Sequence, residues 1–263
     1  MDITEIATEA DKPTTIYEVP LNSRIRHFLR YEYLINEIEA RLASQDNHVV
    51  VDILRLLHNL IEINTNNDMR GEVMRHLNWQ YQKLRELENQ PQVDQAYLKE
   101  KSEAKKRTLA EIENISIPIT MYHNHHLLST TKSRFSVTGG LANFNLPIFT
   151  TWTTLPRDRL QADLNEWYEP FKELYRGVQD ALSMTRESRE FATYQCETGY
   201  YAEDFPVPKN YQMIRLSVDR DIFPKTSVSP SRLIVYFFKT TDFQQSPQQV
   251  KNLIHFRMAF CNL

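Results

Sequence analysis

Glycine is scarce in this sequence. It accounts for 5 of the 263 residues, whereas ordinary proteins contain about 7% glycine. A nucleotide-binding loop needs several closely spaced glycines, because its backbone must approach phosphate groups. The five glycines are too dispersed for a P-loop or a dinucleotide-binding pattern and stand at positions 71, 139, 140, 177 and 199. The sequence therefore argues against chemistry that depends on such a loop.

Cysteine is rare as well, with only Cys196 and Cys261. Two cysteines make neither a disulfide framework nor a C-x-x-C metal or redox site. We expect two ordinary thiols in a reducing compartment, although the sequence leaves a single bridge between them open.

Long apolar runs and a surplus of positive charge are also missing. No segment approaches the roughly 18 consecutive apolar residues that span a bilayer, and the acidic segment Met1–Thr15 lacks the basic and apolar parts of a signal peptide. We therefore expect a cytoplasmic protein with no membrane partner. The net charge of −3 argues against a dedicated nucleic-acid binder, which usually carries excess basic residues.

What the chain does contain is enough apolar sequence for a core of one or two domains, with 41% hydrophobic and 25% charged residues. After a disordered tail at 1–15, the alternation in Thr14–Val19 predicts a short strand that stops at Pro20. Asn22 is placed to cap a helix that continues to Leu42, because apolar residues then recur every three or four positions. The same periodicity predicts further helices over 48–63, over 70–88 and from Asp94 onward. The charged stretch of this last helix, 97–109, is typical of a solvated face, with a coiled-coil arm as the alternative.

The composition changes after Pro118. We expect a strand around 144–152, a helix over 156–187, and strands over 191–196, 211–218, 231–238 and 250–260, with prolines between them. The predicted class is α+β, an N-terminal helical bundle domain packed against a mostly antiparallel β domain. The helical domain is expected to comprise 20–135 plus 156–190. The β domain is expected to comprise 16–20, 141–153 and 191–263.

Assembled catalytic motifs do not occur in the sequence. His123 and His126 would share a helix face, but no nearby carboxylate or thiolate completes a metal site, so an exposed loop or helix end is the better interpretation. The acid pairs Glu166/Glu169 and Glu187/Glu190 lie in amphipathic helical sequence and are typical of surface charge. We expect no enzyme activity, no cofactor and no metal.

Arginine is the residue type that stands out. Arg24, Arg26 and Arg30 fall within two turns of the first helix, and Arg70 opens the third. Arg134 precedes an aromatic residue, and Arg215 and Arg232 sit inside apolar strands. A strand arginine must meet solvent, a carboxylate or a partner, because an unpaired buried guanidinium is costly. Each is therefore an ordinary surface or ion-paired residue, or part of a basic groove for an acidic or amphipathic peptide.

These arginine-bearing segments resemble the ZapD family (also called YacF) of FtsZ-associated bacterial division proteins. The opening of that family resembles Tyr17-Glu18-x-Pro20-Leu21-Asn22-x-Arg24-x-x-x-Phe28-Leu29-Arg30-x-Glu32-x-Leu34. A helix start of the family resembles Arg70-Gly71-Glu72-Val73. Its middle motif resembles Arg134-Phe135-Ser136-x-x-Gly139-Gly140-x-x-x-Phe144-Asn145-Leu146-Pro147-x-x-x-x-Trp152. Its C-terminal strands are similar to Ile214-Arg215-Leu216 and Ser231-Arg232, around Phe223-Pro224.

The resemblance implies a cytoplasmic homodimer at the mid-cell division ring, which binds the C-terminal tail of FtsZ, bundles its filaments and stabilises the Z-ring. By position, Arg30, Arg70 and Arg232 match basic residues that the family uses near an interdomain groove. His126 and Tyr236 stand where arginine is expected. Asn145 and Ser23 likewise replace an aspartate and a glutamate, which alters the charge of the groove. The expected partner-binding set is Arg24, Arg26, Arg30, Arg70, His126, Arg134, Arg215, Arg232 and Tyr236.

Two other functional classes stay open on the sequence alone. One is a cytosolic enzyme with an unrecognised acidic or histidine site in the interdomain cleft. The other is a nucleic-acid adaptor that uses the Lys/Arg-rich fourth helix.

Overall fold

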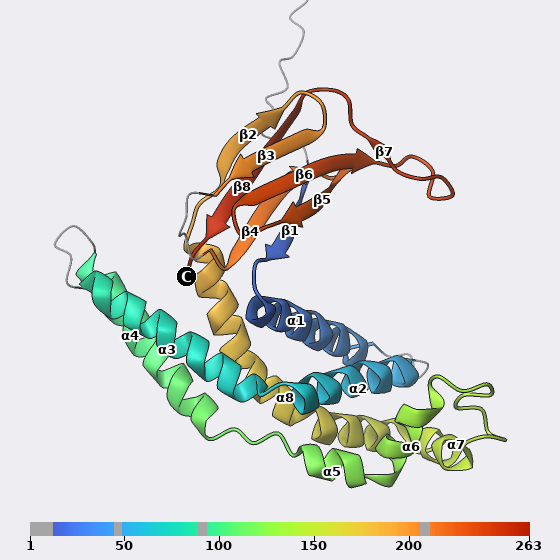
Figure 1. The fold of residues 1–263 in the computed structure, drawn as a ribbon. Coiled ribbons are helices and arrows are strands. Elements are labelled where there is room, and N and C mark those ends of the chain that lie inside the picture. The colour runs from blue at the N-terminus through green and yellow to red at the C-terminus, as the bar shows by residue number, and fades with distance from the viewer. Residues whose placement is uncertain (1–12, 45–48, 89–93, 206–210) are drawn as a thin grey trace, which may run out of the picture. The chain divides into compact units, whose positions relative to one another are not determined.

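The chain divides into two compact units. The computed structural model describes residues 13–44, 49–88, 94–205 and 211–263. We call Met1–Arg26 with Met184–Leu263 the β unit, and His27–Ser183 the helical unit. The α+β class is thereby confirmed, with a helical N-terminal region and a β C-terminal region (Figure 1).

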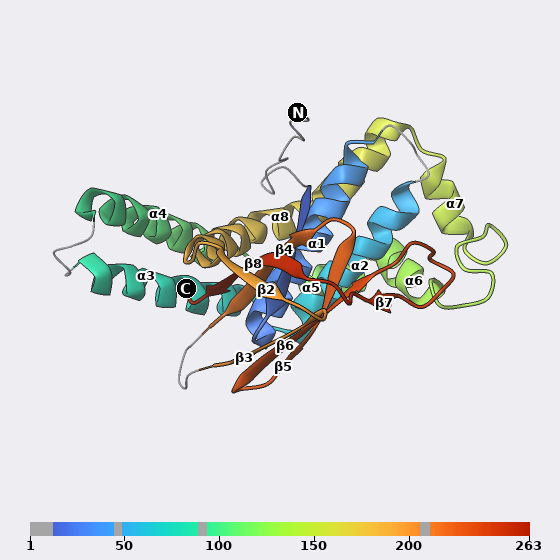
Figure 2. The ribbon, with the colours of Figure 1, turned by 90° about the horizontal axis from the view of Figure 1, so that it is seen from above.

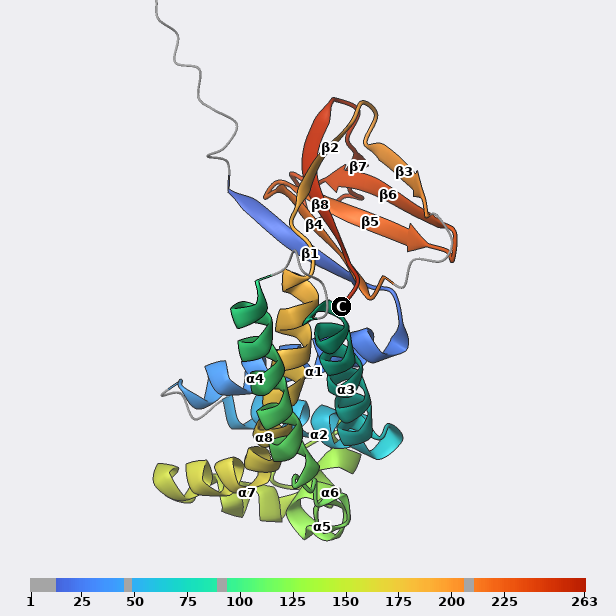
Figure 3. The same ribbon diagram turned by 90° about the vertical axis from the view of Figure 1, so that its left-hand side faces the viewer.

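The β unit consists of two antiparallel sheets. The first has the strand order β1-β4-β8-β2, and the second has β3-β6-β5 with β7 beside β6. The strands are β1 (Thr14–Pro20), β2 (Ala192–Cys196), β3 (Tyr200–Asp204), β4 (Met213–Asp219), β5 (Ile222–Val228), β6 (Arg232–Lys239), β7 (Gln248–Gln249) and β8 (Ile254–Cys261). Alternate residues of β4, β6 and β8 form one apolar cluster, as expected when two sheets pack face to face (Figure 3).

The helical unit is built around the long helix α8. Its helices, some of which extend into the β unit, are α1 (Ser23–Leu42), α2 (Val50–Asn66), α3 (Met69–Glu88), α4 (Gln95–Glu113), α5 (Ile119–Asn124), α6 (His126–Arg134), α7 (Pro147–Thr153) and α8 (Arg157–Glu187). Helices α3 and α4 lie side by side (Figure 2). A Cβ on Gly177 of α8 would lie only 2.7 Å from a methyl carbon of Val73 and 2.8 Å from one of Ile112. The absence of a side chain at Gly177 thus lets α3 and α4 approach α8 closely.

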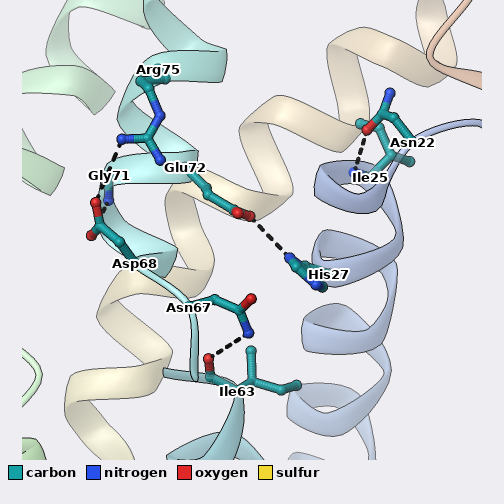
Figure 4. A network of polar contacts seen from close by, with 9 residues as sticks. All are labelled: Asn22, Ile25, His27, Ile63, Asn67, Asp68, Gly71, Glu72 and Arg75. Atoms are coloured by element: carbon teal, nitrogen blue, oxygen red, sulfur yellow. Dashed lines mark hydrogen bonds and ion pairs between the residues drawn. The ribbon is translucent and has the colours of Figure 1, made fainter. Parts of the chain in front are cut away.

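Helix α1 begins where the sequence predicts. The Asn22 side-chain oxygen accepts a hydrogen bond from the Ile25 N–H at 2.9 Å, which satisfies a donor that the helix leaves open. One turn later His27 Nδ1 lies 3.1 Å from Glu72 Oε2 and ties α1 to α3 (Figure 4). Deeper in the unit, the Tyr31 hydroxyl donates to the Phe171 carbonyl of α8 at 3.1 Å.

Lys105 departs from the solvated face expected of the fourth helix. Its side chain is only 3% exposed, and its Nζ donates to Asp180 Oδ1 at 2.6 Å and to Gln80 Oε1 at 3.0 Å. The helical periodicity places residues 98, 102, 105 and 112 on one buried face. A buried ammonium group is costly unless a carboxylate pairs with it, and Asp180 supplies that carboxylate. The other charges of the predicted stretch lie at least partly exposed.

Other expectations for the secondary structure were wrong. The strand expected around 144–152 is instead helix α7 in the helical unit, and the segment 141–153 therefore does not join the sheets. Pro147 occupies the first turn of α7, where a missing N–H does no harm. Strands β3 and β5 were not foreseen. Pro224 lies inside β5 rather than between strands, which is tolerated because β5 is an edge strand.

At the N-terminus, residues 1–12 of the expected tail lie outside the described residues. Thr14 and Thr15 of that tail belong to β1. The predicted strand and its end at Pro20 are confirmed.

Candidate functional site

The nine residues expected to bind a partner are shared between the two units. The β unit carries Arg24, Arg26, Arg215, Arg232 and Tyr236, and the helical unit carries Arg30, Arg70, His126 and Arg134. Each group is therefore described within its own unit. Convergence of all nine into one basic groove stays a prediction.

Arg215 takes part in an internal ion-pair cluster of the β unit. It lies in β4 directly opposite Glu18 of β1, with its Nε 3.3 Å from Glu18 Oε1. The same carboxylate receives two hydrogen bonds from Arg186, from Nε and from Nη2, both at 2.7 Å. The Arg215 guanidinium also lies 5.0 Å from the centre of the Phe191 ring. With side-chain exposures of 18% for Arg215 and Glu18 and 25% for Arg186, these charges hold the sheet together.

Arg232 and Tyr236 are brought together on the outer side of β6. They stand four residues apart on one strand and therefore share a face. The Arg232 Nε lies 3.5 Å from Asp204 Oδ1, with half of the arginine side chain and 78% of the aspartate side chain exposed. Tyr236 is 38% exposed, and its ring centre lies 5.3 Å from that of Tyr200. This pair is accessible to a partner.

The three arginines of α1 are also available. Arg26 and Arg30 are exposed and Arg24 is half-buried. Within the described residues, no ion pair engages any of the three. Their charges are therefore free to meet an acidic ligand.

Arg70 has a local structural role. Its Nη1 donates to the Glu113 carbonyl at 3.2 Å and to the Ile115 carbonyl at 3.1 Å. These oxygens lie at the C-terminal end of α4, where helix carbonyls lack partners within the helix. The guanidinium therefore joins the start of α3 to the end of α4.

His126 and Arg134 occupy opposite ends of α6. His126 is its exposed first residue and Arg134 its half-buried last, which separates them by about 12 Å along the axis. His125 caps this helix, because its Nδ1 accepts from the Leu128 N–H at 3.4 Å. The expectation of a helix end at this histidine cluster is confirmed. Over the described ranges, no group of three His, Cys, Asp or Glu residues is arranged to hold a metal ion.

A small apolar pocket of about 140 Å³ lies nearby in the helical unit, lined by His58, Ile61, Tyr122, His123, Leu128, Ser129 and Lys132. The His58 Nε2 lies 3.1 Å from the Thr131 hydroxyl. Burial, helped by the charge of Lys132, lowers the pKa of His58 to about 4. His58 is therefore neutral near pH 7 and packs as a polar core residue.

A groove of about 510 Å³ in the β unit contains none of the nine expected binding residues. Its lining mixes hydroxyls and charges of both signs from several strands and comprises Thr14, Thr193, Ser217, Asp219, Ile222, Leu253, Ile254, His255, Phe256 and Arg257. Within it, Arg257 Nη2 donates to the Ser217 hydroxyl at 3.3 Å.

Both cysteines are free thiols in the structure and both are buried. Burial raises the pKa of Cys196 and of Cys261. The expectation of two ordinary thiols is confirmed. In the parts of the chain that the structure covers, no helix is long and apolar enough to cross a membrane.

Comparison with known proteins identifies the family. A family model described as "ZapD: Cell division protein" matches residues 29–236. The chain belongs to the ZapD family. Proteins named "Cell division protein ZapD" are similar to this chain over 94% of its length. The one from Bordetella pertussis is 28% identical over 248 residues, and the match covers 98% of that protein. The one from Shigella flexneri is 24% identical over 247 residues, with 98% of that protein covered, and the one from Ralstonia nicotianae is 27% identical over 261 residues, with 99% covered. The ZapD resemblance seen in the motifs is thereby confirmed, and the role is in cell division.

Sequence reasoning overlooked two residues beside the ZapD-family positions. Tyr200 and Lys225 flank Tyr236 in the strand register, one on β3 and the other on β5. They were missed because β3 and β5 were not predicted. The only aromatic or apolar pairs in these segments are Tyr200-Tyr201 and Ile222-Phe223, which lack the alternation of a strand, and Pro224 interrupts the second segment.

Proposed function

We propose that this ZapD-family protein acts as a homodimer that binds the C-terminal tail of FtsZ and cross-links FtsZ filaments into bundles at the division site. The observation that carries the proposal is the similarity to proteins named for cell division. The match to the Bordetella pertussis protein covers 94% of this chain and 98% of that protein. It extends the motif resemblance from separate segments to almost the whole sequence.

Such a function needs two identical binding sites and no chemical reaction. A two-fold dimer supplies both sites. A short tail covers little surface, so each site is expected to bind with a Kd on the order of micromolar, equivalent to about −8 kcal/mol. Many tails on a filament and two sites on a dimer then raise the avidity without any new contact.

The structure separates the expected binding residues by how accessible their charges are. Arg30 and Arg232 expose their side chains, and we assign to them the main contacts with the tail. Arg215 and Arg70 satisfy internal partners, and we assign to them the support of the two units. Salt-sensitive binding is expected, since exposed charge pairs are screened.

Charge reversal tests the assignment directly. Arg30→Glu and Arg232→Glu are each expected to abolish binding of an FtsZ tail peptide in isothermal titration, while circular dichroism and the oligomeric state stay unchanged. Arg107→Glu is a matched control, because this arginine is also exposed on a helix surface. Unchanged affinity in both main variants would remove these residues from the site.

Co-pelleting tests the function itself. The wild-type protein is expected to sediment with polymerised FtsZ and to yield bundles, and not to sediment with FtsZ that lacks its C-terminal tail. Analytical ultracentrifugation should find a dimer. Equal sedimentation with both forms of FtsZ, or a monomer that still forms bundles, would contradict the proposal.

A further inference from the structure

The outer side of the β3-β6-β5 sheet carries four aromatic rings. Strand β6 turns Leu233, Val235 and Phe237 into the core, where each is fully buried. The alternate residues of β6 therefore face outward, and the antiparallel register sets their neighbours on β3 and β5 on the same side. We call this surface the aromatic face and define it by Tyr200, Phe223, Lys225, Arg232, Tyr236 and Phe238.

The rings of the aromatic face contact one another in pairs. The ring centres of Tyr200 and Tyr236 lie 5.3 Å apart, and those of Phe223 and Phe238 lie 6.0 Å apart. Tyr200 is 39% exposed and Tyr236 38% exposed. An antiparallel sheet with one face toward water normally carries polar residues there. A water-facing group of aromatic residues is instead typical of a binding surface.

Positive charge accompanies the rings. Lys225 places its Nζ 4.6 Å from the centre of the Phe238 ring, and Arg232 stands at the other end of the strand. The facing Asp204 holds Arg232 only at 3.5 Å and is itself 78% exposed. An ion pair so open to solvent contributes little stability. A ligand carboxylate can therefore take the place of Asp204 at low cost.

The spacing of these groups defines a ligand. Tyr236 and Phe238 follow Arg232 by four and six residues, which is about 13 and 20 Å along a strand. An extended peptide rises by the same amount per residue. The matching ligand is thus an extended peptide with a carboxylate and a large apolar side chain four to six residues apart.

We propose that the aromatic face is the part of the FtsZ-tail site that selects an apolar side chain of the tail. Tyr200 and Phe238 are its specificity residues, and Arg232 anchors a carboxylate of the same peptide. This inference rests on the proposed function and adds to it two residues that the basic groove did not include.

Isothermal titration with an FtsZ tail peptide at low and at high salt tests the inference. Tyr200→Thr and Phe238→Thr are each expected to lower the affinity about five- to tenfold at both salt concentrations, because they remove apolar contact rather than charge. Arg232→Gln is expected to lose affinity mainly at low salt, where charges are least screened. Tyr200→Phe, which keeps the ring, should retain the wild-type affinity.

Two controls make the result specific. Ile16→Thr changes a residue of similar exposure, 48%, on the other sheet, and should bind the peptide as the wild type does. On the peptide, each apolar residue is replaced by serine in turn. One of these replacements, four to six residues from an acidic residue, should lower the affinity, and its effect should not add to that of Tyr200→Thr.

The outcomes distinguish this inference from the function on which it rests. A wild-type protein that binds no tail peptide would refute both. A wild type that binds, together with Tyr200→Thr and Phe238→Thr variants within twofold of it, would refute the aromatic face alone. An equal loss in Ile16→Thr would also refute it, since the effect would then be general to the β unit.

Discussion

Loss of the Glu18 carboxylate should weaken the β unit strongly. Its carboxylate accepts two hydrogen bonds from Arg186 at 2.7 Å and lies 3.3 Å from Arg215. Glu18→Ala removes the carboxylate that both neighbouring guanidinium groups contact. Removing one partner of a buried ion pair costs about 3–5 kcal/mol. These side chains are 18–25% exposed and therefore not fully buried. We expect Glu18→Ala to lower the free energy of unfolding by an amount near the lower end of that range, about 3 kcal/mol.

The same geometry ranks the variants of the cluster. Arg215→Met removes one ion pair and the contact with Phe191 but leaves Glu18 paired with Arg186, so we expect a loss of about 1–2 kcal/mol. Arg186→Met removes two charge-assisted hydrogen bonds, and its loss of stability should lie between those of Arg215→Met and Glu18→Ala. Glu18→Gln, which keeps a hydrogen-bond acceptor, should cost less than Glu18→Ala.

The assay must report on the β unit alone. All three tryptophans, Trp79, Trp152 and Trp167, belong to the helical unit, so tryptophan fluorescence does not follow the sheets. The unfolding of the sheets is instead followed by amide hydrogen exchange of the β4 and β8 segments during a urea titration. A loss in Glu18→Ala no larger than that in Arg215→Met would refute the view that one carboxylate holds both arginines.

Two further predictions concern the helical unit and can be followed by tryptophan fluorescence in urea. The pKa of His58 is lowered to about 4 from an ordinary value of 6.5, so the unfolded chain binds the additional proton as the pH falls from 6.5 to 4. The free energy of unfolding should therefore drop by about 3 kcal/mol over that range, and a His58→Gln variant that keeps the whole drop would contradict this origin. Lys105→Met should lower the free energy of unfolding at pH 7 by about 3 kcal/mol, because Asp180 and Gln80 lose the buried lysine that they contact. The double variant that also carries Asp180→Asn should recover part of this loss of stability. No recovery in the double variant would exclude the ion pair as the cause.

The long helices were predictable because their signals are local. Apolar residues at three- and four-residue steps marked α1, α2, α3 and α8, and the Asn22 cap marked the beginning of α1. The segment around Phe144 and Trp152 misled because a short apolar run does not distinguish a strand from a buried helix. Pro147 was compatible with either, and its position in the first turn of α7 was decided by packing.

The candidate site was predictable in its residue types but not in their roles. Arg215 and Arg232 both belong to apolar strand segments, since Ile214 and Leu216 flank Arg215 and Leu233 and Ile234 follow Arg232. Only the pairing of β1 with β4 brings Glu18 opposite Arg215, from nearly 200 positions away, whereas Arg232 faces water. Lys105 shows the same limit, since its partner Asp180 belongs to a distant helix. Contacts between residues far apart in the chain are what a single sequence does not reveal.

Pro224 has a consequence for the protein in a crowded assembly. If the protein acts as the cross-linker that we propose, many copies would lie along one polymer, and exposed strand edges held close together tend to pair and aggregate. The proline takes one N–H donor out of the seven-residue edge strand β5. In the filament bundles that we propose, copies that lie side by side would thereby be discouraged from pairing through this strand.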